Sequence, residues 1–142
     1  MFNRFICWLA NSPFRRLVSR SVVVVRYNGR RSGKPYAVPV NYVIREHDGS
    51  RRLWITSARD RVWWRNFMGG GKAELLLNGE ILSVELYAVL DPNSVEEGLI
   101  EYLAGNPRAA KYFNVKLDDA GVPEKNDLRN AAENRVMVYA DL

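Results

Sequence analysis

Apolar positions alternate with polar ones in short runs along the chain, which indicates a protein built mainly of β-strands. Asp48-Gly49 and Asn78-Gly79 fall between consecutive runs, and both pairs are typical of tight hairpin turns. These patterns predict six short, mostly antiparallel strands, over residues 21–27, 35–45, 52–57, 73–77, 81–90 and 135–140.

Helical signals come before and between these strands. Ser12-Pro13 is a typical helix start, with a separate helical turn expected over residues 2–10. A second, short helix is expected over residues 60–68, and it ends at Gly69. The segment 2–10 is rich in aromatic residues, which suit either the core or a membrane surface, and we expect the core.

The longest predicted helix follows the fifth strand. Asp91 or Asn93 can cap it, and Ser94 with Glu97 matches a capping box. Pro107 interrupts this helix, which restarts as a short helix to about Phe113. Residues 114–133 are polar and irregular, and are expected to be loop or weak helix. The fold class is therefore mainly β with helices (α+β), as a small barrel with an N-terminal helix and helices before the last strand.

The composition is that of a globular protein. The 142 residues are 47% apolar and 11% aromatic, and we expect residues 1–142 to form a single domain. No apolar run approaches the ~20 residues that span a bilayer. Cys7 is the one cysteine and His47 the one histidine, so the sequence indicates no internal disulfide, zinc cluster or Ser/His/Asp triad.

Charge divides the chain into two unlike halves. Residues 1–72 carry 15 Lys and Arg against 3 Asp and Glu, whereas residues 73–142 carry 6 against 13. Sixteen of the 21 basic residues are arginine, the side chain best suited to bidentate contacts with phosphate or carboxylate. Nucleic acid, an anionic membrane surface and an anionic small molecule are all compatible with this charge.

The most informative segment is the turn between the first two predicted strands, Asn28-Gly29-Arg30-Arg31-Ser32-Gly33-Lys34. Glycines at both ends permit backbone conformations that point amides inward, and the cationic side chains add further donors. The turn is therefore a candidate anion site, with a solvated hairpin turn as the alternative. It is not a P-loop, because the glycine spacing is one residue short and Pro35 replaces the required Ser or Thr. No GxGxxG follows a strand either, so a Rossmann nucleotide site is not indicated.

Three features close together in sequence suit a large, flat, anionic cofactor: the cationic turn, an apolar strand and a helix that carries aromatic and amide groups. Phosphate is expected on Arg30, Arg31, Ser32 and Lys34. The ring system is expected along Ala37-Val38-Pro39-Val40, with a second phosphate contact at Thr56-Ser57-Ala58-Arg59. Such a cofactor carries its own hydride chemistry, so no protein acid–base pair is needed.

These segments, in this order, resemble the deazaflavin-dependent nitroreductase family of split β-barrel flavin and deazaflavin oxidoreductases. The resemblance covers residues 22–80 and is carried by Gly29 to Pro35, Val38-Pro39-Val40 with Tyr42, Thr56-Ser57, and Trp63-Trp64-Arg65-Asn66-Phe67. It implies a six-stranded antiparallel split β-barrel of the FMN-binding type that binds coenzyme F-420, a deazaflavin with a phosphate and a polyglutamate tail. FMN is the alternative cofactor, and some related barrels bind heme.

The resemblance also implies roles for individual residues. Contacts to the tail and phosphate fall on Arg30, Arg31, Ser32, Gly33 and Lys34, and a second phosphate-contacting stretch falls on Thr56, Ser57, Ala58 and Arg59. Val38, Pro39 and Val40 would lie beside the ring. Trp63 either lines the pocket or belongs to the core, and Asn66 either contacts the cofactor or holds the phosphate loop. Tyr112 would lie near the substrate, as a proton donor or a packing residue.

The chain departs from the family in two places. The loop from Ser57 to Trp63 is shorter and lacks the family's glycines, with Arg59 and Arg61 in their place, and the polar segment 114–133 is unusual. The resemblance implies an oxidoreductase that transfers hydride from reduced coenzyme F-420 to a quinone, an activated alkene or a nitro compound. The alternatives are an FMN-dependent reductase and a non-catalytic protein that binds a cofactor or tetrapyrrole.

We expect a small-molecule substrate rather than nucleic acid, because the arginines lack a regular aromatic stacking platform. A cytoplasmic location is expected, and peripheral membrane contact through the N-terminal helix is an alternative. Split barrels often bury one face in a dimer, so a homodimer is a further expectation.

Overall fold

The computed structural model describes residues 21–142, so the expected helical segments at 2–10 and from Ser12 lie outside the described residues. Residues 21–142 contain one sheet in the order β2-β1-β5-β6-β7-β4-β3, in which all neighbouring strands pair antiparallel. The strands are β1 (Val22–Asn28), β2 (Pro35–Asn41), β3 (Val43–His47), β4 (Ser50–Ala58), β5 (Gly71–Leu77), β6 (Glu80–Val89) and β7 (Arg135–Asp141).

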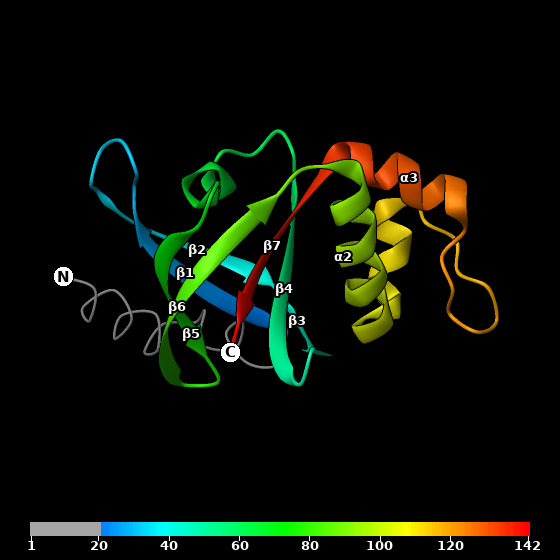
Figure 1. Ribbon diagram of the computed structural model, residues 1–142, viewed down its shortest axis with the longest axis horizontal. Helices are drawn as coiled ribbons and strands as arrows, with labels where there is room; N and C mark the ends of the chain where they lie inside the picture. The colour runs from blue at the N-terminus through cyan, green and yellow to red at the C-terminus, as the bar shows by residue number, and fades with distance from the viewer. Residues whose placement is uncertain (1–20) are drawn as a thin grey trace.

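The described residues thus form seven strands where the sequence predicted six, because the run 35–45 is two strands rather than one. It breaks at Tyr42, which separates β2, paired with β1, from β3, paired with β4. Since β2 and β3 are the two edges of the sheet and one residue joins them, the sheet must curl until its edges approach each other. The result is a curled antiparallel sheet in the form of a half-barrel, which is visible in Figure 1.

The inside of the curl is a continuous apolar core. Val23, Val25 and Tyr27 of β1 alternate into it, and Leu75 of β5 and Val138 of β7 meet them. The short 3-10 helix η2 (Trp63–Phe67) closes one end of this core, where Phe67 packs its ring edge against Tyr27 at 5.2 Å between ring centres. The predicted helix over residues 60–68 is therefore present in shortened form.

The remaining helices cover the outer face of β3, β4 and β7. Figure 1 shows α2 (Pro92–Gly105) and α3 (Lys125–Asn134) together on that side of the sheet. Gly98 lets α2 approach closely, because an added Cβ would lie 2.8 Å from Cγ of Met137 and 3.0 Å from the Trp54 ring. The 3-10 helix η3 (Pro107–Phe113) follows α2, as Pro107 predicted.

The structure identifies the residues that cap α2 and α3. Asp91 caps α2, since its carboxylate accepts a hydrogen bond from the amide of Ser94 at 3.0 Å. Ser94 therefore lies inside the first turn, and the capping box expected at Ser94 and Glu97 is not the cap. Within the polar segment 114–133, Glu124 caps α3 by accepting from the amides of Asn126 and Asp127.

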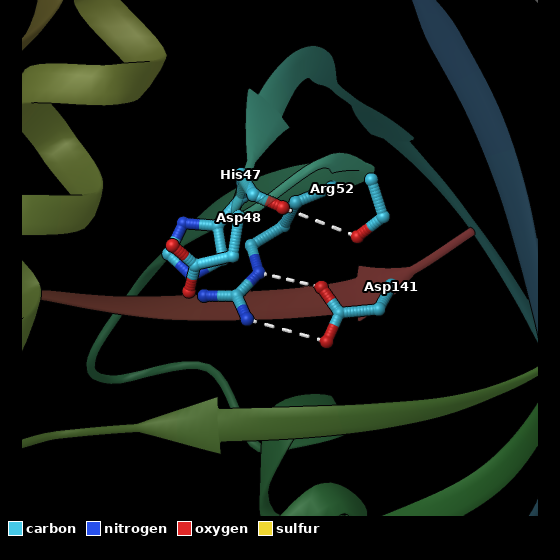
Figure 2. Close-up of polar contacts among 5 residues, drawn as sticks. His47, Asp48, Arg52 and Asp141 are labelled. Atoms are coloured by element: carbon cyan, nitrogen blue, oxygen red, sulfur yellow. Dashed lines mark hydrogen bonds and ion pairs between the residues drawn. The ribbon is translucent and has the colours of Figure 1, made fainter.

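An ion pair ties β4 to the last strand at the end of the sheet away from η2. Arg52 donates from Nε to Asp141 Oδ1 at 2.7 Å and from a terminal nitrogen to Oδ2 at 3.2 Å. Figure 2 shows this two-pronged contact beside His47, whose Nε2 lies 3.4 Å from Asp48 Oδ2. The guanidinium also lies over the Tyr139 ring, 4.0 Å from its centre. His47 belongs to the end of a hairpin, as its sequence context predicts.

Candidate functional site

Two clefts open on either side of Trp63, and that residue forms part of the wall of both. The first, here the turn cleft, has a volume of about 640 Å³ and lies between the β1–β2 turn and η2. The second, here the central cleft, has a volume of about 670 Å³ and lies between the sheet and η3. Both volumes are in the range of small-molecule sites.

The turn that the sequence singled out is closed by its own backbone. The amide of Gly29 donates to the carbonyl of Lys34 at 2.8 Å, and the amide of Gly33 donates to the carbonyl of Gly29 at 2.9 Å. Gly33 has φ of 68°, a conformation that favours glycine. Ser32 Oγ accepts from the Lys34 amide at 3.2 Å. The turn is therefore a defined hairpin loop that its own hydrogen bonds close.

Arg30 and Asn66 fasten this turn to η2. The Arg30 amide donates to Asn66 Oδ1 at 2.8 Å, and Asn66 Nδ2 donates to the Trp63 carbonyl at 2.9 Å. A terminal nitrogen of Arg30 also donates to the carbonyls of Met68 at 2.8 Å and Gly70 at 3.2 Å. The Arg30 guanidinium is thus engaged with backbone carbonyls.

The other two cations of the turn cleft are exposed to solvent, and the guanidinium carbon of Arg65 lies 5.5 Å from the centre of the Trp64 ring. Arg31 and Arg65 both line it and are exposed, and no Asp or Glu among the described residues contributes to its wall. Tyr36, Val62 and Met68 add apolar surface. Arginines beside apolar surface, without a carboxylate, suit an anion that carries a flat or aliphatic part.

Trp63 connects the two clefts to the core. It is 7% exposed, and its indole Nε1 donates to Ser57 Oγ at 3.1 Å. Trp63 and Trp64 both belong to the barrel core, but of the two only Trp63 also lines a cleft. The Trp63 side chain therefore packs in the core and also borders both clefts, and its contact with a cofactor stays a prediction.

One wall of the central cleft comes from the strands that the sequence placed beside a ring system. Pro39 and Val40 of β2 face it, and so do Thr56, Ser57 and Ala58 at the end of β4. The β2 residues are apolar, whereas β4 contributes two hydroxyl groups, which donate to the carbonyls of Val136 at 3.4 Å and Ala58 at 3.2 Å. This wall suits a planar group that has polar atoms along one edge.

Further lining residues come from the end of α2, from η3 with the residue before it, and from the start of β7: Tyr102, Asn106, Arg108, Tyr112, Phe113 and Arg135. Arg135 is half-buried, and its Nε donates to Thr56 Oγ1 at 2.9 Å. Its guanidinium carbon lies 4.4 Å from the centre of the Phe113 ring. Burial lowers the pKa of Arg135, and the nearby Tyr102 partly opposes this effect. Burial likewise raises the pKa of the Tyr102 hydroxyl.

The predicted site residues therefore divide into three groups. The turn cleft includes Arg30, Arg31, Ser32, Trp63 and Asn66, and the central cleft includes Pro39, Val40, Thr56, Ser57, Ala58, Trp63 and Tyr112. A third group, Gly33, Lys34, Val38 and Arg59, lines neither cleft.

Arg59 lines neither cleft because its side chain is engaged elsewhere. Its guanidinium donates to the carbonyls of Leu90 at 2.7 Å and Arg135 at 3.4 Å, so it ties the end of β4 to its neighbours. Arg61, two residues along, lines the central cleft instead.

Sequence reasoning missed Arg108 and Arg135 as site residues. They lie far along the chain from the β4 end, and no local pattern marks them. Arg135 reaches Thr56 because β7 pairs with β4, with Ala58 opposite Arg135. A strand register of this kind was not contained in the local hydrophobic pattern.

Among residues 21–142, no group of three His, Cys, Asp or Glu side chains is placed to hold a metal ion. In the same part of the chain, none of the helices has the length and apolarity that crossing a membrane requires.

Comparison with solved structures shows the fold. The general stress FMN/FAD binding protein from Xanthomonas citri is 18% identical with a TM-score of 0.53, over 90% of this chain and 80% of that one. A Clostridium acetobutylicum protein related to general stress protein 26, of the pyridoxinephosphate oxidase family, is 15% identical with a TM-score of 0.50, over 95% and 83%. A structure described as a domain-swapped dimer is 15% identical with a TM-score of 0.54, over 96% and 92%. The sequence matches no protein-family model and no curated protein.

Proposed function

We propose that the protein is an oxidoreductase that binds a flavin-type cofactor, coenzyme F-420, and reduces a small organic acceptor such as a quinone, an activated alkene or a nitro compound. One observation carries the proposal: two clefts that share Trp63 present three arginines each, and no Asp or Glu of the described residues lines either one. An elongated cofactor with an anionic tail and a flat ring matches that pair of clefts.

The residues present fit such a cofactor. Arg31, Arg65 and Ser32 in the turn cleft would hold its phosphate and acidic tail, while Arg30 and Asn66 keep the turn in place. Pro39 and Val40 would lie against the ring, with the Ser57 and Ala58 segment on its polar edge. Bound there in reduced form, the cofactor supplies a hydride.

The protein's own contribution is to position and shield the reactants. Residues of α2, η3 and β7 line the central cleft together with those of β2 and β4, so an acceptor would lie in this cleft beside the ring. The Tyr112 side chain is 75% exposed and lines this cleft, so its hydroxyl is available to donate a proton to the reduced product.

The choice of F-420 rests on the resemblance carried by the turn at 29–35 and the segments that follow it. The general stress protein from Xanthomonas citri, described as FMN/FAD binding, supports the wider flavin class for this fold. FMN is therefore the competing cofactor.

A direct titration tests the proposal. Purified protein is titrated with oxidised coenzyme F-420, FMN and heme, with cofactor fluorescence or absorbance as the signal. We expect F-420 to bind with the highest affinity, and protein loaded with reduced F-420 to reduce a quinone or nitro compound. The proposal fails if no cofactor binds below about tens of micromolar, a level that corresponds to weak binding. Tighter binding of FMN would replace the deazaflavin with a flavin, and binding without acceptor reduction would indicate a non-catalytic protein.

A homodimer remains a prediction for this chain. The similar structure described as a domain-swapped dimer supports it at the level of the fold. Light scattering coupled to size-exclusion chromatography would give the mass in solution, where a mass near 16.3 kDa contradicts the dimer.

A further inference from the structure

The central cleft contains a half-buried positive charge that no described carboxylate neutralises. Arg135 forms none of the ion pairs found among residues 21–142. Its Nε is fixed by Thr56 Oγ1, and the Phe113 ring lies against its guanidinium. Its two terminal nitrogens, unlike Nε, form no hydrogen bond to another described residue. The guanidinium is therefore fixed in position with donors still available.

A partly desolvated cation without a counter-ion is unfavourable, and an anion that reaches it recovers that cost. Burial already lowers the pKa of Arg135, which is the expected sign of this desolvation. Arg108 of η3 and Arg61 line the same cleft and are exposed. The cleft thus offers an anion one donor group held in place and two that are exposed to solvent.

The wall around Arg135 is also aromatic. The Phe113 ring lies against the guanidinium, and the exposed Tyr112 lines the same cleft, as do the largely buried Trp63 and Tyr102. Aromatic surfaces favour flat ligands, because rings pack in offset stacks or edge to face. The combination of a fixed guanidinium and ring surfaces selects for a planar molecule with a negative charge at one end.

We propose that the central cleft binds a small planar carboxylate, with the carboxylate on Arg135 and Arg108 and the conjugated or aromatic part against Phe113 and Tyr112. The proposal that this carboxylate is the hydride acceptor rests on the proposed function. It restricts the acceptors to anionic compounds with a conjugated or aromatic part. The binding itself depends on residues of this chain alone and is measurable without a cofactor.

Paired probes test the binding. Protein without cofactor is titrated with benzoate and with its neutral analogue benzamide, by calorimetry and by nuclear magnetic resonance of the arginine Nε–H groups. We expect benzoate to bind about tenfold or more tighter than benzamide, as one charge-assisted contact implies. The Arg135 Nε–H signal should shift with benzoate. Equal affinity for the two probes would overturn the proposal.

Variants locate the site. Arg108→Gln changes an exposed side chain and Arg135→Gln changes the fixed one, and each should weaken benzoate about tenfold while leaving benzamide unchanged. Arg51→Gln, an exposed arginine of β4 that lines neither cleft, is the matched control and should leave benzoate binding intact. If Arg135→Gln does not fold, Arg108→Gln still decides. Unchanged benzoate affinity in Arg108→Gln, or an equal loss in Arg51→Gln, contradicts the proposal.

A third arm separates this ligand from a cofactor phosphate, which has similar chemistry. Benzoate is titrated into protein saturated with F-420 or FMN, and we expect it still to bind in a manner that depends on Arg108. If the cofactor displaces benzoate and Arg108→Gln weakens the cofactor equally, the arginines hold the cofactor phosphate and the acceptor site is wrong. If neither cofactor binds, the proposed function fails, whereas the selective binding of benzoate still stands on its own.

Discussion

The amide nitrogen of Arg30 lies 2.8 Å from Oδ1 of Asn66, and this hydrogen bond joins the β1–β2 turn to η2 across 36 residues of sequence. Asn66 in turn donates to the Trp63 carbonyl. One amide side chain therefore sets the distance between the cationic turn and the tryptophan that borders both clefts. The shape of the turn cleft depends on it.

Replacement of Asn66 by alanine should loosen the turn with a modest loss of stability. One net hydrogen bond corresponds to about 0.5–1.5 kcal/mol of unfolding free energy, because water can satisfy the exposed Arg30 amide. Hydrogen exchange of the amides at 29–34 should accelerate, and cofactor affinity should fall with it. Asn126→Ala, at an exposed position in α3, is the control. Unchanged exchange in the turn would show that Asn66 does not hold it.

Replacement of the two adjacent arginines in the turn should affect different quantities, stability for Arg30 and cofactor affinity for Arg31. Arg30→Ala removes the donors to the Met68 and Gly70 carbonyls, so it should lower the unfolding free energy by about 1–2 kcal/mol. Arg31→Ala removes an exposed cation of the turn cleft. It should leave stability unchanged and weaken F-420 or FMN by about 1.5–3 kcal/mol, the usual contribution of a charged contact.

Denaturant titration and cofactor titration of both variants separate these two roles. Arg51→Ala, on an exposed part of β4 outside the clefts, should change neither quantity. Full cofactor affinity in Arg31→Ala would remove Arg31 from the binding site and leave the turn with a structural role alone.

Loss of the hydrogen bond from Trp63 to Ser57 should lower the free energy of unfolding. Ser57→Ala leaves the buried indole Nε1 without its acceptor, which costs about 1–3 kcal/mol. Chemical denaturation followed by tryptophan fluorescence measures the unfolding free energy. Ser83→Ala on β6 removes an exposed hydroxyl and should stay within about 0.5 kcal/mol of the parent protein. A similar small effect for Ser57→Ala would mean that the indole finds another acceptor.

Acid should weaken the contact between β4 and the last strand. The hydrogen bonds from Arg52 lower the pKa of Asp141 in the folded protein; burial opposes this, and the charges of Arg52 and His47 reinforce it. Because the folded pKa lies below the unfolded value of about 3.9, the contribution to stability is complete above that value and disappears as pH falls through the folded pKa.

Asp141→Asn should therefore lower the unfolding free energy at pH 6 by up to about 1 kcal/mol, since the carboxylate is half exposed and solvent screens the pair. The difference from the parent protein should shrink as pH falls through the folded pKa of Asp141, below which both side chains are neutral. Denaturation across pH 2–7 measures this convergence. A constant difference over that range would show that the Arg52–Asp141 pair makes no charge-dependent contribution. Figure 2 shows the atoms involved.

The strands and several turns were predictable from the sequence because their signals are local. Asn78-Gly79 predicted a two-residue hairpin, and β5 and β6 pair across it with positive φ at both residues. The break at Tyr42 was not predictable. Val40, Tyr42 and Ile44 all pack against the same barrel core, so the apolar alternation continues unbroken through the corner where the chain changes strand partner.

The candidate site also has features that local sequence predicts and features that it does not. A cationic turn, an apolar strand and an aromatic helix in that order are predictable from local sequence, because each depends on neighbouring residues alone. Which of their side chains meet follows from the folded chain: Arg30 bonds to backbone carbonyls, Arg59 reaches Leu90 and Arg135 reaches Thr56. Those contacts follow from strand register and sheet curvature, which depend on pairings between distant residues that local patterns do not encode.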